Sequence, residues 1–370
     1  MSQSITVGIN GFGRIGRAVL RASLHPSNAD IKVVHINNLA SPDIAAHLLN
    51  YDSVHGSLQT SHNITATNTN TNTKETTTPN THQDTQHDTA LRLCGTFRGE
   101  DNHTQYISYS RHTDPEMIPW EQLGVDMVLE CSGAFNSYEG ASSHHRGGAK
   151  RVLVSAPCQE APLTVVYGVN DHNITGQETI ISNASCTTNC LAVVAHLLCE
   201  NFGVDHASMS TVHAYTSDQK LLDGPHKDLR RARSAALSMI PTTTGAAKMV
   251  GEVVPKLKDK IHGMAIRVPT ANVSLTDAVF ALSCDTSIQD VHAVLTEAAA
   301  NTLKGVLGIS ALPLVSCDYN GSTYSATVDT SFSKIINKRM CKLLLWYDNE
   351  TGFSWRMLDV ARSWIAKSSA

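Results

Sequence analysis

A glycine-rich turn directly after a β-branched run is the feature that most constrains how this chain folds. Residues 5–9 read ITVGI, typical of a short buried strand, and residues 15–24 read as a helix. Between them stands a G-x-G-x-x-G turn made of Gly11, Phe12, Gly13, Arg14, Ile15 and Gly16. In such a turn the glycines permit a tight bend, close approach of a pyrophosphate, and close packing of helix on strand. The turn therefore predicts a dinucleotide site at the helix N-terminus, whose free N–H groups face the phosphates.

The alternation of apolar runs predicts an α/β fold, with a Rossmann-type, doubly wound parallel sheet in the first half of the chain. A second strand is expected at 31–36, a helix at 42–50, and further buried strands at 126–133 and 151–157. After Gly203, strand-like segments dominate. They predict a second, α+β domain whose sheet is mostly antiparallel.

An asparagine, Asn38, stands after the second predicted strand, where dinucleotide sites usually carry an acidic residue for the ribose. Its amide can hydrogen-bond a ribose hydroxyl without carrying charge, or it can simply cap the loop that follows. The choice between NAD and NADP is therefore open.

A polar segment at about 60–90 interrupts the α/β pattern. Twelve of its 31 residues are threonine, and asparagine, histidine, glutamine and aspartate fill most of the rest. Because almost nothing apolar is available to bury, we expect a mobile or extended surface loop. Short hairpin strands are compatible with this composition, since strands tolerate threonine well.

The segment 182–190, SNASCTTNC, places Cys186 at the predicted start of a helix. The helix dipole and the free N–H groups at such a position favour a thiolate and lower the thiol pKa, so Cys186 is a candidate nucleophile. Ser185 and Thr187 flank it and can cap the helix or hold an anion. Cys190, one turn later, is expected to be structural.

The best-placed base among the 18 histidines is His213, which ends a strand-like run and precedes a polar loop. A histidine chosen by pattern alone is more often a surface or structural residue. Other histidines form no closed ligand set, so no metal site is expected.

Composition narrows the function classes further. Lysine and arginine number 29 and aspartate and glutamate 33, so the formal net charge is −4, which excludes a strongly basic nucleic-acid binder. No apolar run approaches 18 residues, and the N-terminus lacks the pattern of a signal peptide. The nine cysteines form no CxxC pair. We therefore expect a cytoplasmic protein with reduced thiols and no membrane contact.

Taken together, the motifs resemble those of the phosphorylating glyceraldehyde-3-phosphate dehydrogenase family. The matching segments occur in family order along nearly the whole chain, with 60–90 as the exception: GINGFGRIGR at 8–17, HLLNYDSVHG at 47–56, SNASCTTNC at 182–190, HAYTSDQ at 213–219, DLRRAR at 228–233, TTGAAK at 243–248, RVPTANVSLTD at 267–277 and WYDNETGFS at 346–354. SNASCTTNC with a downstream HAYT is the most specific of these pieces.

The resemblance implies the domain organisation. Residues 1–185 would form the NAD-binding Rossmann domain, with the polar insertion inside it, and 186–350 the catalytic domain. Residues 351–370 would be a C-terminal helix that returns to the NAD-binding domain. The family is normally homotetrameric, and a loop at about 214–240 would reach toward a neighbouring subunit's cofactor.

The resemblance also implies the reaction, a glycolytic oxidation of D-glyceraldehyde 3-phosphate to 1,3-bisphosphoglycerate with NAD. Cys186 would attack the aldehyde to give a hemithioacetal, and His213 would take the hydroxyl proton as hydride leaves. His213 would also keep Cys186 ionised through charge pairing. Inorganic phosphate would then cleave the thioester.

The remaining site residues are carried over by motif match. The implied pocket for the substrate phosphate contains Thr216 and Arg267. The implied pocket for inorganic phosphate contains Ser185, Thr187, Arg230, Thr244 and Gly245. Cofactor contacts are implied for Ser132, Gly133 and Asn349. From the pattern alone, Arg230, Arg231 and Arg233 can equally form a solvated basic face.

The chain departs from the usual family pattern at Asn38, Ser217 and Phe353. The first departure allows some use of NADP beside NAD. Erythrose-4-phosphate dehydrogenase is the nearest alternative, although it does not normally keep HAYT or TTGAAK. An alternative of another class is a nucleotide- or nucleic-acid-binding protein with a second role, but the expected function requires no nucleic acid.

Overall fold

The computed structural model describes residues 4–58, 62–68, 89–97 and 100–368. By its internal contacts the chain divides into two compact units. Unit 1 comprises Met1–Leu163, Gly176–Ser182 and Trp364–Ala370, and unit 2 comprises Thr164–Thr175 and Asn183–Ser363. No described helix has the length and apolar character that a membrane crossing requires.

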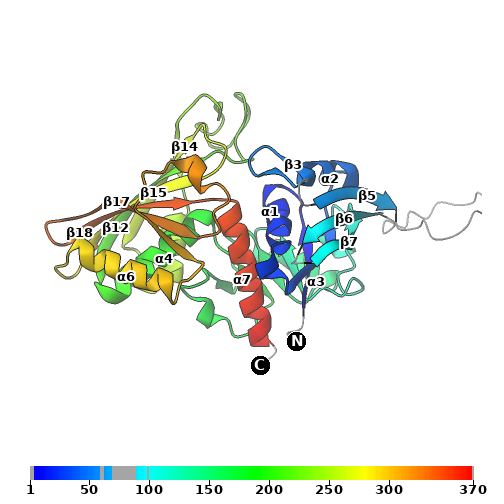
Figure 1. Ribbon diagram of the computed structural model, residues 1–370, viewed down its shortest axis with the longest axis horizontal. Helices are drawn as coiled ribbons and strands as arrows, with labels where there is room; N and C mark the ends of the chain where they lie inside the picture. Colours follow the sequence, from blue (N-terminus) through cyan, green and yellow to red (C-terminus); the bar gives the residue numbers. More distant parts are fainter. Residues whose placement is uncertain (1–3, 59–61, 69–88, 98–99, 369–370) are drawn as a thin grey trace, which may run out of the picture. The chain divides into compact units, whose positions relative to one another are not determined.

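The core of unit 1 is a nine-stranded sheet with the order β10-β11-β9-β8-β1-β2-β7-β6-β5. Figure 1 shows the neighbouring strands β5, β6 and β7 at one edge of this sheet. Its strands are β1 Ile5–Asn10, β2 Ile31–Asn37, β5 His62–Asn68, β6 Thr89–Phe97, β7 Glu100–Ser110, β8 Met127–Glu130, β9 Val152–Val154, β10 Leu163–Thr164 and β11 Ile180–Ser182. β1 pairs in parallel with β2 on one side and β8 on the other, so Val7 lies between Val33 and Met127. β9 and β11 continue the parallel pairing. The predicted parallel Rossmann sheet is confirmed.

Two of the helices that connect these strands, α1 Arg14–Ser23 and α2 Pro42–Asn50, lie where the apolar spacing predicts them. A third, α3 Tyr138–Arg146, was not predicted. Ser41 caps α2 with its side chain, which accepts from the backbone N–H of Ile44, and Pro42 at the first turn lacks the N–H that would have no partner there. Short elements complete the unit: the hairpin β3 Tyr51–Asp52 and β4 Gly56–Ser57, and the 3₁₀ turns η1 Pro26–Asn28 and η2 Pro115–Met117.

The polar segment at about 60–90 is only partly the loop that its composition predicts. β5 and the first residues of β6 form antiparallel strands that extend the sheet, and Ile64 is 2% exposed. The side chain of Asn50 holds both backbone groups of Ile64, donating to its carbonyl (2.6 Å) and accepting from its N–H (3.3 Å). The burial of Ile64 thus anchors β5 at the edge of the sheet. Residues 69–88 lie outside the described part of the chain.

Truncation of Ile64 tests this anchor. We expect Ile64→Ala to lower the free energy of unfolding by about 2–5 kcal/mol, the usual cost of emptying a buried aliphatic site. Urea denaturation measures it as a lower midpoint with an unchanged slope. Thr65→Ala, which alters the exposed face of the same strand, is the control and should stay within about 0.5 kcal/mol. Equal stability of the two variants would mean that β5 is not part of the core.

Unit 2 is built on a seven-stranded sheet with the order β13-β14-β12-β15-β18-β17-β16 (Figure 1). Its strands are β12 Val204–Ala214, β13 Ile240–Thr243, β14 Ile261–Val268, β15 Ser274–Leu282, β16 Leu307–Ser310, β17 Ala326–Ile336 and β18 Met340–Tyr347. Four of the six strand pairs are antiparallel, and only β12–β14 and β16–β17 are parallel. The prediction of a mostly antiparallel second sheet is confirmed.

The helices of unit 2 are α4 Cys186–Asn201, α5 Ala246–Val253, α6 Ile288–Ala300 and α7 Thr351–Ser368, with 3₁₀ turns η3 Asp171–Asn173, η4 Pro255–Leu257 and η5 Ser316–Tyr319. α4 is the central helix, because its apolar side chains pack in one cluster with those of β15, β17 and β18. Leu191, Val194 and Leu198 are fully buried in this cluster. The burial of α4 fixes the direction of its first turn, where Cys186 lies.

The contact division differs from the expected domain boundaries in three places. Thr164–Thr175 and residues 183–185 group with unit 2, as does most of α7. Arg356 explains the grouping of α7, since it donates to the carbonyl of Gly305 (3.1 Å) and lies 5.9 Å above the ring of Tyr167. Only the end of α7 groups with unit 1, where Ser368 contacts the Gly176 carbonyl. The functional boundaries 1–185, 186–350 and 351–370 stay a prediction.

Candidate active site

The first turn of α4 presents Cys186. Ser185 is the N-cap: its backbone is extended, and its hydroxyl accepts from the N–H of Thr188 (3.1 Å) and contacts the Thr188 hydroxyl (2.7 Å). Ala184, just before it, has a positive φ of 55°, a conformation that costs a non-glycine residue free energy and marks a tightly specified bend. Bend and cap together hold Cys186 at the partly exposed start of an otherwise buried helix.

β12 delivers His213 to the same place. His213 is the penultimate residue of the strand, is 4% exposed, and lies with its Nε2 3.5 Å from Sγ of Cys186. The structure therefore brings together the nucleophile and the base that the sequence singled out separately. This distance suits proton transfer between thiol and imidazole.

Burial decides the charge state of this pair. Desolvation, reinforced by the nearby Arg267, lowers the pKa of His213 to about 3. Desolvation also raises the pKa of Cys186 above its ordinary value, although Arg267 and hydrogen bonds involving Thr187 oppose this. The Cys186 pKa is therefore shifted in the direction opposite to the expected lowering. Removal from water costs each charged form free energy, so burial favours the neutral thiol and the neutral imidazole over the expected thiolate–imidazolium pair.

Tyr347, at the end of β18, packs against His213 of the Cys186–His213 pair. Its ring stands edge-on to that of His213, and its hydroxyl contacts the hydroxyls of Thr187 (2.9 Å) and Thr211 (2.8 Å). Thr187 is 4% exposed and points into this buried cluster. The expectation that Thr187 offers its hydroxyl to a phosphate is therefore not met in this arrangement. Its hydroxyl, like that of Ser185, organises the start of α4.

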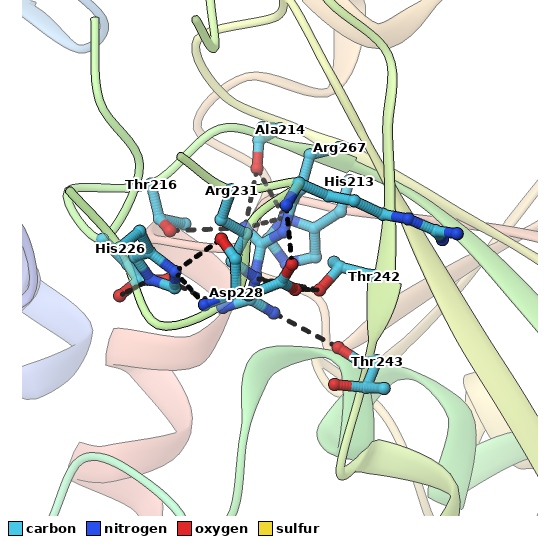
Figure 2. A network of polar contacts seen from close by, with 11 residues as sticks. His213, Ala214, Thr216, His226, Asp228, Arg231, Thr242, Thr243 and Arg267 are labelled. Carbon is cyan, nitrogen blue, oxygen red and sulfur yellow. Dashed lines mark hydrogen bonds and ion pairs between the residues drawn. The ribbon is translucent and has the colours of Figure 1, made fainter. Parts of the chain in front are cut away.

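The next pair that the structure brings to this site is Arg267, on β14, and Thr216, in the loop after β12. Nη1 of Arg267 lies 3.0 Å from Nδ1 of His213, 3.0 Å from the carbonyl of Ala214 and 3.3 Å from the hydroxyl of Thr216 (Figure 2). Parallel pairing places Arg267 directly beside His213. A guanidinium and a hydroxyl here form a donor-rich corner that suits an anion.

Sequence reasoning missed Arg231. Its Nε donates to the hydroxyl of Thr242 (3.0 Å), one Nη to Asp218 (2.7 Å) and the other to the Thr243 carbonyl (3.2 Å) (Figure 2). Its charge also contributes to the lowered pKa of His213. The guanidinium of the neighbouring Arg230 contacts the Pro241 carbonyl of the same strand, at 3.5 Å.

The local sequence gives no means of choosing between these adjacent arginines, because the order of two arginines in an irregular loop has no periodicity. The contacts that distinguish Arg231 are tertiary: it pairs with Asp218, and Asp228 accepts from the same Thr242 hydroxyl that Arg231 contacts.

Thr244 and Gly245 begin α5, immediately after the β13 residues that Arg231 contacts. The Thr244 hydroxyl accepts from the N–H of Ala246 (3.2 Å), and no atom lies within 4 Å of the place where a Cβ on Gly245 would stand. Gly245, the N-cap of α5, thus has open space beside it, and it lies two residues after Thr243, whose carbonyl Arg231 contacts. This arrangement suits a second anion.

Asn349 follows β18 and is held by Ser274. The Ser274 hydroxyl donates to Oδ1 of Asn349 (3.0 Å) and accepts from the N–H of Ala214 (3.1 Å). Because this contact occupies the amide oxygen, the orientation leaves the Nδ2 group of Asn349 to donate to a carbonyl acceptor such as a carboxamide.

In unit 1 the glycine turn has the geometry that a dinucleotide requires. Gly11 has a φ of +87°, and a Cβ there would collide with the Ser132 backbone; a Cβ on Gly16 would collide with the Gly11 carbonyl. Gly13, by contrast, faces open space. The residues present therefore fit a pyrophosphate above Gly13. Phe12 is buried, and Arg14 pairs with Asp52 (2.6 Å).

Ser132 and Gly133 form the turn after β8. Glu130, which sequence reasoning did not single out, is fully buried and accepts from both the N–H and the hydroxyl of Ser132 (2.7 and 2.5 Å). An acidic residue inside the apolar run of β8 was the available signal. Glu130 also accepts from Asn10 (2.6 Å), so the carboxylate ties this turn to the strand that leads into the glycine turn.

Asn38 lies beside the glycine turn. Its Oδ1 accepts from the N–H of Phe12 (3.2 Å), and its Nδ2 donates to the hydroxyl of Tyr109 (3.3 Å). That hydroxyl in turn donates to the Ala40 carbonyl (2.9 Å). The contacts fix the amide orientation next to the phosphate-binding turn.

Among the described residues, no three His, Cys, Asp or Glu side chains gather so as to hold a metal ion.

Comparison with known proteins agrees with this geometry. The family model described as the NAD binding domain of glyceraldehyde 3-phosphate dehydrogenase matches residues 5–95, and the one described as its C-terminal domain matches residues 185–349. The chain is 47% identical over 359 residues to the glyceraldehyde-3-phosphate dehydrogenase of Geobacillus stearothermophilus, covering 97% of both chains. It is 46% identical over 358 residues to that of Cereibacter sphaeroides, covering 97% of this chain and 98% of the relative.

Proposed function

Since the chain belongs to the glyceraldehyde-3-phosphate dehydrogenase family, we propose that it oxidises D-glyceraldehyde 3-phosphate with NAD and couples the oxidation to inorganic phosphate. The observation that carries the proposal is the 3.5 Å approach of Cys186 to His213, with Arg267 bonded to the same imidazole. Nucleophile, base and an anion-binding guanidinium thus lie together on rigid elements.

The chemistry proceeds from the neutral pair. As Sγ of Cys186 attacks the aldehyde carbon, Nε2 of His213 takes the thiol proton and returns it to the new oxyanion, which gives a hemithioacetal. His213 then takes the hydroxyl proton while the carbon is oxidised to a thioester. Bound NAD supplies the hydride acceptor. Inorganic phosphate attacks the thioester, and the leaving thiolate of Cys186 regains its proton.

The two anion pockets follow from the donors described above. Arg267 and Thr216 would hold the phosphate of the substrate, and Arg231, Thr244 and Gly245 the attacking phosphate. We assign to Arg231 the role first expected for Arg230, because the guanidinium of Arg231 donates to both Thr242 and Thr243 and its charge contributes to the lowered pKa of His213. Asn349 would hold the nicotinamide carboxamide, and the glycine turn, Asn38 and the turn at Ser132 and Gly133 the rest of NAD.

The test is NADH formation with glyceraldehyde 3-phosphate, run with and without phosphate or arsenate. We expect turnover that requires one of these anions. Erythrose 4-phosphate, tested in parallel, should be the poorer substrate. Turnover that is independent of phosphate, or that prefers erythrose 4-phosphate, would contradict the proposal; the nucleic-acid-binding alternative has no supporting contact among the described residues.

We propose a homotetramer as the working assembly. Large apolar side chains are exposed by more than 70% along one loop of unit 2, which is more than a solvated loop normally carries: Leu221, Leu222, Leu229, Leu237 and Met239. Sedimentation equilibrium measures the assembly as a multiple of the 39.9 kDa chain.

We also propose the cytoplasm as the compartment, because the eight described cysteines are all free.

Substitution of Asn38 tests how NAD is distinguished from NADP. An aspartate would still accept from the Phe12 N–H but would repel a 2′-phosphate, whereas the neutral amide does not. We expect NAD to be the better cofactor of the wild type, with measurable NADP use. Asn38→Asp should lower the NADP kcat/KM about tenfold relative to NAD, a difference of about 1.4 kcal/mol. Steady-state kinetics with both cofactors measures this ratio.

The control for this prediction is Tyr109→Phe, which removes the hydroxyl that contacts the Asn38 amide and the Ala40 carbonyl, and adds no charge. It should change the NAD-to-NADP ratio much less than Asn38→Asp does. An unchanged ratio in Asn38→Asp would show that residue 38 does not contact the ribose.

A further inference from the structure

Nδ1 of His213 has two contacts that cannot both be hydrogen bonds. It lies 2.6 Å from the carbonyl oxygen of Ala214, which only accepts, and 3.0 Å from Nη1 of Arg267, which only donates (Figure 2). The first contact requires a proton on Nδ1 and the second requires a lone pair there. A neutral imidazole satisfies one or the other, so the two contacts favour different tautomers.

The tautomers differ in what Nε2 presents to Cys186. When Nδ1 donates to Ala214, Nε2 carries the lone pair and can take the thiol proton across the 3.5 Å gap. When Nδ1 accepts from Arg267, the ring proton lies on Nε2, and His213 has no lone pair left for the thiol. The doubly protonated ring does not resolve the conflict, because burial and Arg267 lower the pKa of His213 to about 3.

We propose that Arg267 is a substrate-sensing positioning residue: it holds His213 in the tautomer that cannot act as a base until a phosphate on the aldehyde draws the guanidinium away. The inference rests on the proposed function, in which Arg267 binds the substrate phosphate. Release lets the imidazole give up its proton at Nε2 and take one at Nδ1 by exchange with water, with no net proton change. The Ala214 carbonyl then retains the active tautomer.

The contacts of Arg267 make this exchange favourable. Its Nη1 has three neutral acceptors within 3.3 Å, those of His213, Ala214 and Thr216. Among the described residues Arg267 forms no ion pair, and its buried Nε has no hydrogen-bond partner. A phosphate dianion would accept charge-assisted hydrogen bonds from the guanidinium N–H groups of Arg267. Charge-assisted hydrogen bonds are about twice as strong as neutral ones. The substrate class favoured is therefore an aldehyde that carries its own phosphate.

The decisive experiment measures the pre-steady-state burst of NADH, which reports acylation of Cys186, with two aldehydes. Arg267→Met removes the donor to Nδ1 and keeps an unbranched side chain. With glyceraldehyde 3-phosphate the burst should slow by about 10²-fold or more, because a phosphate ligand is lost. With unphosphorylated glyceraldehyde it should accelerate by about tenfold, since the base, worth about 10² to 10⁴ in rate, is no longer held in the wrong tautomer.

The matched control is Arg233→Met, the same substitution at an exposed arginine of the neighbouring loop that pairs with Asp223. It should leave both burst rates within about twofold. Thermal unfolding of each variant, measured with NAD present, checks that the fold is retained. A purely phosphate-binding Arg267 would leave the glyceraldehyde burst of Arg267→Met equal to that of the wild type, and this result overturns the inference.

A second measurement uses the wild type alone and so does not depend on how a variant folds. Methyl phosphate supplies the dianion separately and should accelerate the glyceraldehyde burst of the wild type in a saturable way. Absence of any acceleration in the wild type also overturns the inference. Failure of the proposed function would look different, because the wild type would then give no burst with glyceraldehyde 3-phosphate.

Discussion

Cys186→Ser should reduce dehydrogenase turnover by about 10⁴- to 10⁶-fold, the loss found when an enzyme's nucleophile is removed. A serine hydroxyl is a much weaker nucleophile than a thiol, and His213 is too weak a base to ionise it, since burial lowers its pKa to about 3. The Ser185 cap and the buried body of α4 are untouched, so the fold should be retained. Steady-state NADH formation measures the loss, and titration calorimetry with NAD checks that cofactor binding stays within a few-fold.

The control is Cys190→Ala, one turn further along α4. Cys190 is fully buried and its thiol pKa is raised by burial, so it offers no thiolate. Its variant should keep the turnover rate within a few-fold, although a small cavity lowers stability. Comparable losses in the two variants would mean that the effect on turnover comes from α4 packing and not from the thiol of Cys186.

His213→Asn should lower turnover by about 10²- to 10⁴-fold, the contribution of a positioned general base. It should also change the pH profile. With His213 present, the acylation rate should be nearly independent of pH above about 5, because a base with a pKa of about 3 is neutral there. Without it, reaction requires prior ionisation of Cys186, whose pKa burial raises. The rate of the variant should therefore rise about tenfold per pH unit through neutrality.

His206→Asn is the matched control, since His206 lies on the same strand, β12, and is exposed. Its rate and pH profile should match those of the wild type. A near-normal rate in His213→Asn, with a profile as flat as that of the wild type, would remove His213 from its role. Alkylation of Cys186 by iodoacetamide offers a second readout and should slow in His213→Asn; the exposed Cys284 and Cys317 serve as internal references.

Features that depend on neighbours in the chain could be predicted from the sequence. The glycine turn at 11–16, the capped start of α4 at Cys186 and the alternation of strands and helices are local. Their causes are backbone sterics, capping and apolar periodicity. The sequence also identified Cys186, His213 and Arg267 as candidates, by position and by resemblance, and the structure brings Cys186 and Arg267 within hydrogen-bonding reach of the His213 imidazole.

Side-chain contacts, burial and pKa values that depend on segments distant in the chain were evident only in the tertiary structure. It gave Arg231 its hydrogen bond to Thr242, turned Thr187 toward Tyr347, and made Ile64 of the polar insertion part of the core. It also reversed the expected pKa of Cys186, because the desolvation caused by packed neighbours exceeds the helix dipole effect on which the prediction relied. The burial and the electrostatic environment of a site depend on every segment that surrounds it in space, and a local stretch of sequence does not specify those segments.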